Sequence, residues 1–419
     1  MKKILFVLCC ALAMMSFISC SKKGKGAGNG NGESGSAAKV EKSAGKAESA
    51  KTGKSDKKEE TKYKVAMVTD YGDITDESFN QITYEAGKKF CSANNLEYKY
   101  FRPASDSTSD RVSAIEQAIA EGFNVILCPG YAFAGTIVEV SPNYDDVKFI
   151  ALDVAAGDIL AAAIPNYDYN PSKYNVGDYY NTKTVYCAIY KEELAGYMAG
   201  YAAVKLGFRH LGFLGGMAVP AVIRYGYGYV QGASDAAKEL KCEKDVTIEY
   251  VYGNQFYGDA DITAYMDTWY KDKHVEVVFA CGGGIYTSAA EAAKKLKGKK
   301  VIGVDVDQKP TIDAYEPGLT VTSAMKGLAA TVNTLLTETI LNGNWDKYAG
   351  KIETLGLVSE DPSKNYVGLP ESTVWGGDFG QDEYNQLVAD MYNGKITVSD
   401  AIDKEPDAAV RVNYYGNIK

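Results

Sequence analysis

Short apolar runs alternate with amphipathic helical patterns along most of this 419-residue chain, and this alternation restricts its fold more than any other feature. Runs rich in Val, Ile and Leu at 65–69, 125–128 and 148–152 are typical of buried strands. Segments with helical spacing follow the first two runs. Strands that alternate with helices form βαβ units around a parallel sheet, so the sequence predicts an α/β fold.

The alternation occurs in two series. The first ends near residue 152, and an irregular surface segment rich in Tyr, Asn and Pro follows at 158–182 before the second series begins at 184. The roughly 355 residues after the N-terminal part exceed the size at which one core keeps growing. We therefore expect two Rossmann-like lobes with a cleft between them and a multi-stranded hinge. The expected boundaries are 63–184 plus about 320–343 for lobe 1, and 185–319 plus about 344–419 for lobe 2.

The N-terminal part predicts export and attachment to a membrane. Lys2 and Lys3 precede an apolar run that ends near Cys20, which is typical of a signal peptide at 1–19 that is too short to span a bilayer. Cys20 resembles the acylated cysteine of bacterial lipoproteins, and the alternative is an ordinary signal peptide. Residues 20–62 lack apolar periodicity and predict an acylated Cys20 followed by a disordered tether. Acyl chains, at about 0.8 kcal/mol per buried methylene, would then hold the protein on a lipid bilayer.

Charge and cysteine content exclude several classes of protein. The net charge of −9 argues against a nucleic-acid partner. The five cysteines beyond Cys20 are widely spaced, without a CxxC pair or a Cys/His cluster, so buried free thiols are favoured over disulfides or zinc. We therefore predict no metal and no cofactor. These cysteines are Cys91, Cys128, Cys187, Cys242 and Cys281.

The stretch VAMVTDYGDITDESFN at 65–80 brings polar and aromatic side chains to the end of the first strand. Asp70 follows the strand, and Phe79 and Asn80 open the next helix. Ligands of open α/β sheets bind outside the carboxyl ends of the strands, so we expect these three residues to face the cleft. Asp70 as a cap of the turn and Phe79 as a core residue are the alternatives.

The acidic turn inside this stretch has a second interpretation. Asp73, Asp76 and Glu77 are carboxylates, which calcium prefers, but their spacing lacks the glycine and the terminal glutamate of an EF-hand loop. A solvated turn in which Asp76 caps the following helix is therefore favoured.

Two further aspartates follow strands at equivalent places. Asp153 comes after the strand 148–152 and Asp305 after the strand 300–304, so with Asp70 they predict a lining of hydrogen-bond acceptors.

A glycine run and a lysine lie at the ends of later strands. Gly282 to Gly284 follow a strand and precede a helix, and form either an anion-binding loop or a tight turn. Lys326 either donates to a ligand or is an ordinary surface charge.

The sequence gives little support for a catalytic site. His210 and His274 lie beside strands without a nearby serine, cysteine or carboxylate pattern that resembles a triad or a metal motif. We therefore predict a protein that is not an enzyme.

Five ordered motifs resemble the basic membrane protein family, whose members are lipoprotein substrate-binding components of ABC transporters and include purine nucleoside receptors. The motifs are VTDYGDITDESFNQ, YKEELAGYMAGYAA, LGFLGGMAVPAV, ACGGG and VIGVDVDQ. The resemblance extends over nearly the whole chain from Lys64 onward. It implies a type I periplasmic-binding-protein fold that closes on a purine nucleoside (guanosine, inosine or adenosine) and delivers it to an ABC permease. It also implies a lipid-anchored protein of the cell membrane, periplasmic or surface-exposed.

The resemblance implies roles for individual residues. Asp70 and Asp305 would hold the ribose hydroxyls, and Phe79 would stack on the base with Asn80 beside it. A second stacking aromatic matches Phe279, with Tyr286 as its alternative. The remaining pocket residues implied by the family are Asp153, Lys326, Gly282 and Gly283.

Two departures from the family pattern leave other ligands open. The chain reads Gly282-Gly283-Gly284-Ile285 where family members commonly have GGTG, and the Tyr-rich segment at 158–182 is unusual. The alternatives are a sugar- or autoinducer-binding protein of the same fold, and a surface adhesin or interaction lipoprotein.

Overall fold

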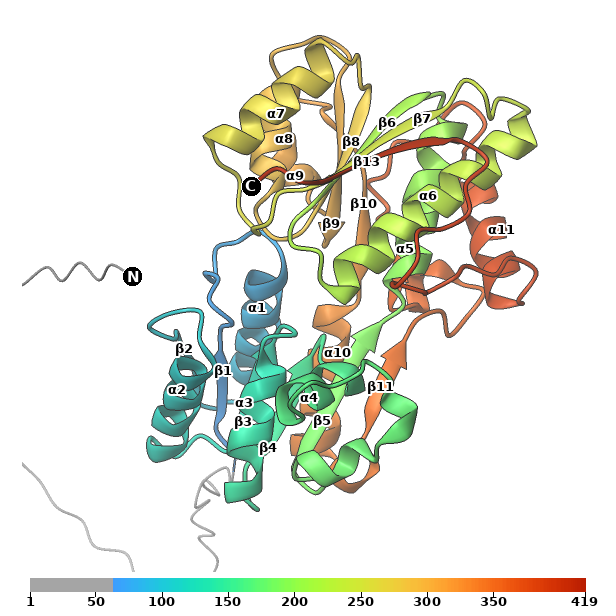
Figure 1. Ribbon diagram of the computed structural model, residues 1–419. Helices are drawn as coiled ribbons and strands as arrows, with labels where there is room; N and C mark the ends of the chain where they lie inside the picture. Colours follow the sequence, from blue (N-terminus) through green and yellow to red (C-terminus); the bar gives the residue numbers. More distant parts are fainter. Residues whose placement is uncertain (1–62) are drawn as a thin grey trace, which may run out of the picture. The chain divides into compact units, whose positions relative to one another are not determined.

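The computed structural model describes residues 63–419. The expected signal peptide, the acylation of Cys20 and the tether that ends at residue 62 lie outside the described residues. Within them, strands and helices alternate from β1 onward and build two lobes, each around its own sheet (Figure 1). The α/β fold predicted from the sequence is confirmed.

The first sheet of the described region has six parallel strands in the order β11-β5-β4-β3-β1-β2. Along β1, Val65 and Met67 contact one core cluster while Ala66 and Val68 contact another, because successive side chains of a strand point to opposite faces. A parallel sheet buried on both faces needs such continuous apolar strands. The strands are β1 (Val65–Val68), β2 (Tyr98–Phe101), β3 (Val125–Pro129), β4 (Lys148–Leu152), β5 (Val185–Tyr190) and β11 (Ile352–Leu355).

Helices cover both faces of this sheet (Figure 1). α1 (Phe79–Ala93) and α10 (Leu328–Leu336) pack on one face, and a short π-helix, Thr337–Leu341, continues α10. The helices on the other face are α2 (Thr108–Ala120), α3 (Phe133–Val140) and α4 (Ala156–Ala163).

The second sheet of the described region has seven strands in the order β12-β10-β9-β8-β6-β7-β13, and only β12 runs antiparallel to its neighbour. α5 and α6 pack on one face, α7, α8 and α9 on the other, and α11 lies beside β12. The strands are β6 (His210–Gly215), β7 (Thr247–Tyr252), β8 (Val277–Cys281), β9 (Lys300–Asp305), β10 (Thr320–Lys326), β12 (Val367–Gly368) and β13 (Arg411–Asn417). The helices are α5 (Glu192–Lys205), α6 (Pro220–Leu240), α7 (Ala260–Lys271), α8 (Tyr286–Ala293), α9 (Lys309–Ile312) and α11 (Gln381–Tyr392).

The chain passes between the two sheets after β5, after β10 and after β11, so the hinge of the described region is multi-stranded as expected. The distribution of strands differs from the expected boundaries at 184/185 and about 320. β5 pairs with β4 and β11 in the first sheet, and β10 pairs with β9 in the second. Both sheets need equally apolar strands, so apolar runs alone do not tell to which sheet a strand belongs.

The segment predicted to be irregular at 158–182 is partly helical. α4 extends to Ala163, and two short 3-10 helices, Pro171–Lys173 and Val176–Tyr179, follow it. The alanine run 161–163 at the end of α4 favours a helix, and the many Tyr and Asn residues after it concealed that signal.

The five cysteines of the described region are free thiols, as predicted. Four of them are buried, but Cys242 is partly exposed. Within residues 63–419, every helix is either too short or too polar to cross a bilayer.

α5 and α6 pack unusually closely because both carry pairs of glycines four residues apart. A β-carbon at Gly228 would lie 2.1 Å from the carbonyl oxygen of Glu193, and one at Gly200 would lie 2.1 Å from that of Tyr229. Real β-carbons do not approach backbone oxygens this closely, so the helices meet at this distance only with glycine at the contact.

We predict that Gly228→Ala lowers the free energy of unfolding by about 3 kcal/mol or more, because the added methyl pushes two backbones apart. Denaturant unfolding measures the change. Gly157→Ala in α4 is the matched control, since no atom lies within 4 Å of its new β-carbon, and it should raise stability by about 0.5 kcal/mol. Equal effects of the two substitutions would contradict this account of the helix contact.

Candidate functional site

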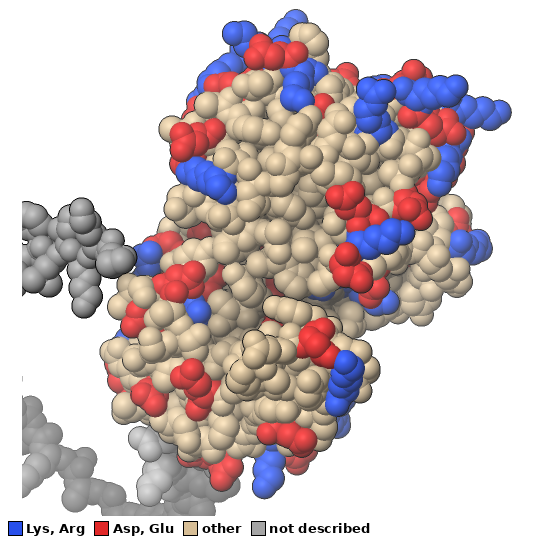
Figure 2. All heavy atoms as spheres, in the orientation of Figure 1, with Lys and Arg blue, Asp and Glu red and all other residues tan. Residues whose placement is uncertain are grey.

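A cavity of ≈ 430 Å³ lies between the carboxyl ends of the two sheets. The segments after β1, β2, β3 and β4 form its wall on the first lobe. The segments after β6, β7 and β8, together with the ends of β9 and β10, form its wall on the second. On the face drawn in Figure 2, the surface is hollowed between the lobes, and acidic and basic side chains lie interspersed around it. This is where ligands of doubly wound sheets bind.

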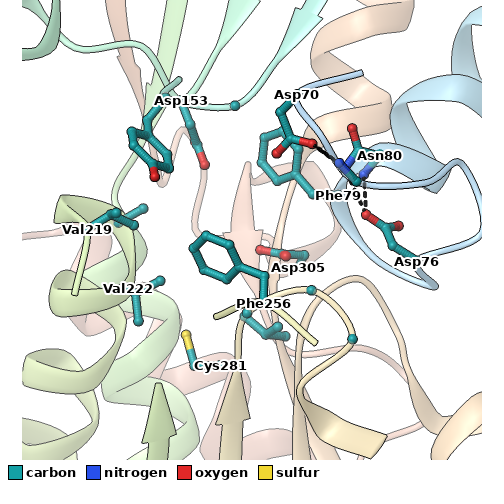
Figure 3. Close-up of a pocket in the computed structure, with 18 of the residues that line it drawn as sticks. Asp70, Asp76, Phe79, Asn80, Asp153, Val219, Val222, Phe256, Cys281 and Asp305 are labelled. Atoms are coloured by element: carbon teal, nitrogen blue, oxygen red, sulfur yellow. Dashed lines mark hydrogen bonds between the residues drawn. The ribbon is translucent and has the colours of Figure 1, made fainter. Parts of the chain in front are cut away.

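Most of the residues predicted for the site line this cavity, and they come from both lobes (Figure 3). The residues that line it as predicted are Asp70, Phe79, Asn80, Asp153, Gly282, Gly283, Asp305 and Lys326.

Phe279 is the exception and is corrected by the structure. Its side chain is 0% exposed and packs against Phe213, Tyr225 and Tyr229 in the core beneath α5 and α6. Tyr286, its alternative, is buried in the core on the other face of the same sheet. Phe279 belongs to the middle of β8, and the cavity is lined only from the end of that strand.

Asp70 caps its turn and also lines the cavity, so its two interpretations hold together. Its Oδ1 accepts hydrogen bonds from the N–H groups of Tyr71 at 2.6 Å and Gly72 at 2.7 Å, and from Nδ2 of Asn80 at 3.1 Å. Burial raises the pKa of Asp70, and these hydrogen bonds lower it again in part.

Asp76 caps α1 as predicted. Its carboxylate accepts hydrogen bonds from the backbone N–H groups of Ser78, Asn80 and Gln81 at 2.9 to 3.0 Å, and from the Asn80 side chain at 3.0 Å. These N–H groups lack partners inside the helix, so Asp76 satisfies the first turn and fixes Asn80 beside the cavity.

Asp153 and Asp305 hold an uncommon backbone conformation. Their φ angles are 60° and 65°, in the left-handed region that costs a residue with a β-carbon about 1 kcal/mol or more. Both residues end strands at the cavity wall, and this conformation turns the chain sharply there while the carboxylates face inward. Strain of this kind gathers at functional sites.

The ammonium group of Lys326 lies at the centre of a buried charge cluster. Its Nζ is 2.5 Å from Oδ2 of Asp153 and 3.6 Å from carboxylate oxygens of Asp305 and Glu192. It also lies 4.7 Å from the centre of the Phe79 ring. The Lys326 side chain is 3% exposed, which excludes an ordinary surface charge.

Burial and neighbouring charges shift the pKa values of this cluster. Burial raises the pKa of Asp153; Lys326 opposes the rise, and the carboxylates of Glu192 and Asp305 add to it. Burial lowers the pKa of Lys326, but the three carboxylates more than compensate and leave it above its ordinary value. Lys326 therefore remains charged at every physiological pH.

Polar contacts join the two lobes at the cavity. Ser78 of the first lobe donates its hydroxyl to Oδ2 of Asp305 at 2.7 Å, and Nε2 of Gln308 donates to the carbonyl of Glu77 at 3.0 Å. With the Lys326–Asp153 ion pair, these contacts join the two lobes beside the cavity.

Phe256 lines the cavity from the loop after β7, and sequence reasoning did not identify it. Its ring lies in the space shared with Phe79 from the opposite lobe (Figure 3). A β-carbon at Gly216 or Gly282 would lie 2.4 Å or 2.8 Å from this ring. The glycine run therefore makes a tight turn, with φ of 137° at Gly282, and also leaves room for Phe256.

Arg224 in the first turns of α6 was also missed. It lines the cavity, and its Nε donates to Oε2 of Glu192 at 2.6 Å. Asp70 was predicted because ligands bind outside the carboxyl ends of the strands. The same rule would have found Phe256, because Phe256 also follows the carboxyl end of a strand. Arg224 lies inside a long helical pattern, where nothing in the sequence marks it.

Comparisons with known proteins agree with this architecture. The model of the family described as "ABC transporter substrate-binding protein PnrA-like" matches residues 63–398. The chain is 26% identical to the "ABC transporter nucleoside-binding protein BmpA" of Lactococcus lactis, over 81% of this chain and 90% of the relative. It is 28% identical to "Basic membrane protein B" of Borreliella burgdorferi, over 74% of this chain and 82% of the relative.

A solved structure shares the fold. An ABC transporter system solute-binding protein from Aeropyrum pernix K1 superposes with a TM-score of 0.58 and 18% identity, over 80% of this chain and 87% of that one. Together with the two doubly wound sheets and the multi-stranded hinge, this likeness supports the type I periplasmic-binding-protein fold.

Glu193 adjoins the charge cluster but does not line the cavity. It is 3% exposed, its Oε2 has no hydrogen-bond partner among the described residues, and burial raises its pKa to about 7. Between its ordinary value of 4.5 and 7, the folded protein holds a proton that the unfolded chain releases. The free energy of unfolding therefore falls as the pH rises through this window.

We predict that Glu193→Gln is more stable than the parent protein at pH 8, by up to about 3 kcal/mol, because glutamine has no charge to bury. The difference should disappear near pH 4.5. Denaturant unfolding at both pH values checks this, with Glu291→Gln on α8, whose side chain is 42% exposed, as a control that should change little at either pH. A parent protein that is more stable than Glu193→Gln at pH 8 would refute the assignment.

Proposed function

The chain belongs to the family of PnrA-like ABC transporter substrate-binding proteins, and on this premise we propose that it binds a purine nucleoside between its lobes and delivers it to an ABC permease. The observation that carries the proposal is the pair of rings, Phe79 and Phe256, which enter one cavity from opposite lobes. They lie beside a lining rich in aspartates, among them Asp70, Asp153 and Asp305. The nucleoside-binding name of the L. lactis relative supports the same ligand class.

The aromatic pair suits a purine base. A base offers two flat faces, and stacking on an aromatic side chain contributes about 1–3 kcal/mol per base. We assign the base to the space between Phe79 and Phe256, with Asn80 at its edge. A cavity of ≈ 430 Å³ is within the usual range for small-molecule sites.

The carboxylates suit the ribose. Hydroxyl groups donate to ionised carboxylates in charge-assisted hydrogen bonds that are roughly twice as strong as neutral ones. We assign the ribose hydroxyls to Asp70 and Asp305, with Asp153, Lys326 and the backbone of the glycine run completing the wall.

Three buried polar atoms at the cavity support an occupant that forms hydrogen bonds. Oδ1 of Asn80, Oδ1 of Asp153 and the hydroxyl of Tyr225 belong to lining residues and have no hydrogen-bond partner among the described residues. Buried polar groups of native proteins are almost always satisfied, so a ligand with donors and acceptors fits here.

Binding without catalysis completes the proposal. Closure of the lobes on the ligand shifts the population from open to closed states, and the permease would recognise the closed state. We further propose that an acylated Cys20 anchors the protein to the cell membrane, on its periplasmic or exposed side, which a tether of the expected length permits.

We predict that Phe79→Ala and Phe256→Ala each weaken nucleoside binding about 5- to 150-fold, the loss of one stacking partner. Isothermal titration calorimetry with guanosine, inosine and adenosine measures this, after denaturation and refolding to remove any bound ligand. Phe279→Leu is the matched control, because it alters a core ring outside the cavity and should leave the affinity within about twofold.

A thermal-shift screen with nucleosides and sugars distinguishes the other ligands. Stabilisation by sugars and not by nucleosides would identify a sugar- or autoinducer-binding protein. No stabilisation by either set would favour a surface adhesin and would contradict the proposal. Unchanged affinity in both Phe79→Ala and Phe256→Ala would contradict the assignment of the base.

A further inference from the structure

Glu192 is a buried carboxylate that contacts two of the cations lining the cavity, Arg224 and Lys326, without lining the cavity itself. It opens α5 within the motif YKEELAGYMAGYAA and is 0% exposed. Its Oε2 accepts from Nε of Arg224 at 2.6 Å, and its Oε1 lies 3.6 Å from Nζ of Lys326. Arg224 and Lys326 reach the cavity from α6 and β10, so one carboxylate holds side chains of two elements.

The charges of this cluster do not balance. Three carboxylates, those of Asp153, Glu192 and Asp305, surround the two cations Lys326 and Arg224. When all three carboxylates are ionised, one negative charge is in excess. Oδ1 of Asp153 has no hydrogen-bond partner among the described residues, and this is the type of acceptor that a ligand hydroxyl needs.

Removal of Glu192 would leave Arg224 buried with other carboxylates within its reach. The Arg224 side chain is 14% exposed, and an unpaired charge at such a depth is costly. Asp153 and Asp158 of the first lobe both line the same cavity and both interact electrostatically with Arg224. Released from Glu192, the guanidinium would pair with one of these carboxylates and compete with a ligand for its oxygens.

We propose that Glu192 is a positioning residue for ligand binding: it holds Arg224 and Lys326 so that carboxylate oxygens of Asp153 and Asp305 remain available to the hydroxyl groups of the ligand. The nature of that ligand rests on the proposed function. The positions of Arg224 and Lys326 are independent of which ligand binds.

This role of Glu192 predicts a particular pH dependence of ligand binding. A ligand hydroxyl donates more strongly to Asp153 while that carboxylate is ionised, so affinity falls as the pH drops below its raised pKa. Glu192 is one of the charges that raise this pKa, and its neutralisation moves the loss of affinity to lower pH. The charged and titratable groups that face Asp153 are Lys326 of β10, Glu192 of α5, Asp305 of β9, Arg224 and Tyr225 of α6, and Tyr190 of β5.

The test compares Glu192→Gln with Glu193→Gln by calorimetric titration with inosine from pH 5 to pH 8. We expect Glu192→Gln to bind about tenfold or more weakly at pH 8 and to lose affinity at lower pH than the parent protein does. Glu193→Gln is matched in helix, residue type and burial, and Glu193 forms no hydrogen bond or ion pair with either cation, although it lies near enough to Arg224 to interact electrostatically. The affinity of this variant should stay within about twofold, with an unmoved midpoint.

A double-mutant cycle separates positioning from a general structural effect. In the Arg224→Gln background only the weaker contact of Glu192 with Lys326 at 3.6 Å remains, so Glu192→Gln should then cost only about threefold or less. The double variant also removes the unpaired charge and keeps the test possible if Glu192→Gln alone folds poorly. An equal loss in both backgrounds, or an unmoved midpoint, would overturn the proposal.

Crystal structures of the ligand-free variants distinguish failure of this proposal from failure of the proposed function. In Glu192→Gln, Arg224 should move toward Asp153 or Asp158, whereas in Glu193→Gln it should stay in place. If the parent protein binds no nucleoside, the proposed function fails, and these structures still test the positioning. An unmoved Arg224 in Glu192→Gln would overturn the positioning whatever the ligand is.

Discussion

The buried ammonium group of Lys326 connects the hinge, the two lobes and the cavity. Lys326 is the last residue of β10, directly before the chain crosses to α10 in the first lobe. Its partners are Asp153 of the first lobe and Asp305 and Glu192 of the second. Removing four charged groups from water is costly, and apolar residues would often stabilise a core at least as well. We interpret the cluster as specifying one arrangement of the two lobes around the cavity.

Backbone geometry at two strand ends supports this cluster. Asp153 and Asp305 adopt left-handed conformations and place carboxylates at the cavity wall on both sides of Lys326. The surrounding sheets hold these residues in place, since each follows a central strand that pairs on both sides. The energy stored there is offset by the apolar burial of the strands behind them.

Close contacts at glycine shape the rest of the second lobe. Glycines let the backbones of α5 and α6 touch, and this contact fixes Glu192 opposite Arg224. Glycines after β6 and β8 leave the space that the Phe256 ring occupies. Glycine is therefore needed both in the core and at the cavity. A side chain would fill the space that the neighbouring helix backbone occupies in the core and that the Phe256 ring occupies at the cavity.

Much of the fold and part of the site could be predicted from the sequence, for a physical reason. Apolar periodicity reports local structure, and parallel sheets bring strand ends together, so Asp70, Asp153 and Asp305 were correctly expected at one cavity. The prediction that Phe279 lines the cavity was wrong. The exact position of a residue along its strand, and not only its proximity to the strand end, decides whether its side chain reaches the cavity. The contact between Glu192 and Arg224 joins residues 32 positions apart through the register of two helices, and no local pattern encodes that register.

The identity of the natural ligand tests the central claim most directly. Mass spectrometry of the small molecules released on denaturing the freshly purified protein measures it. The account predicts a purine nucleoside in about equimolar amount with the protein, and none from a Phe79→Ala/Phe256→Ala double variant. A sugar released in equimolar amount in place of a nucleoside would contradict it.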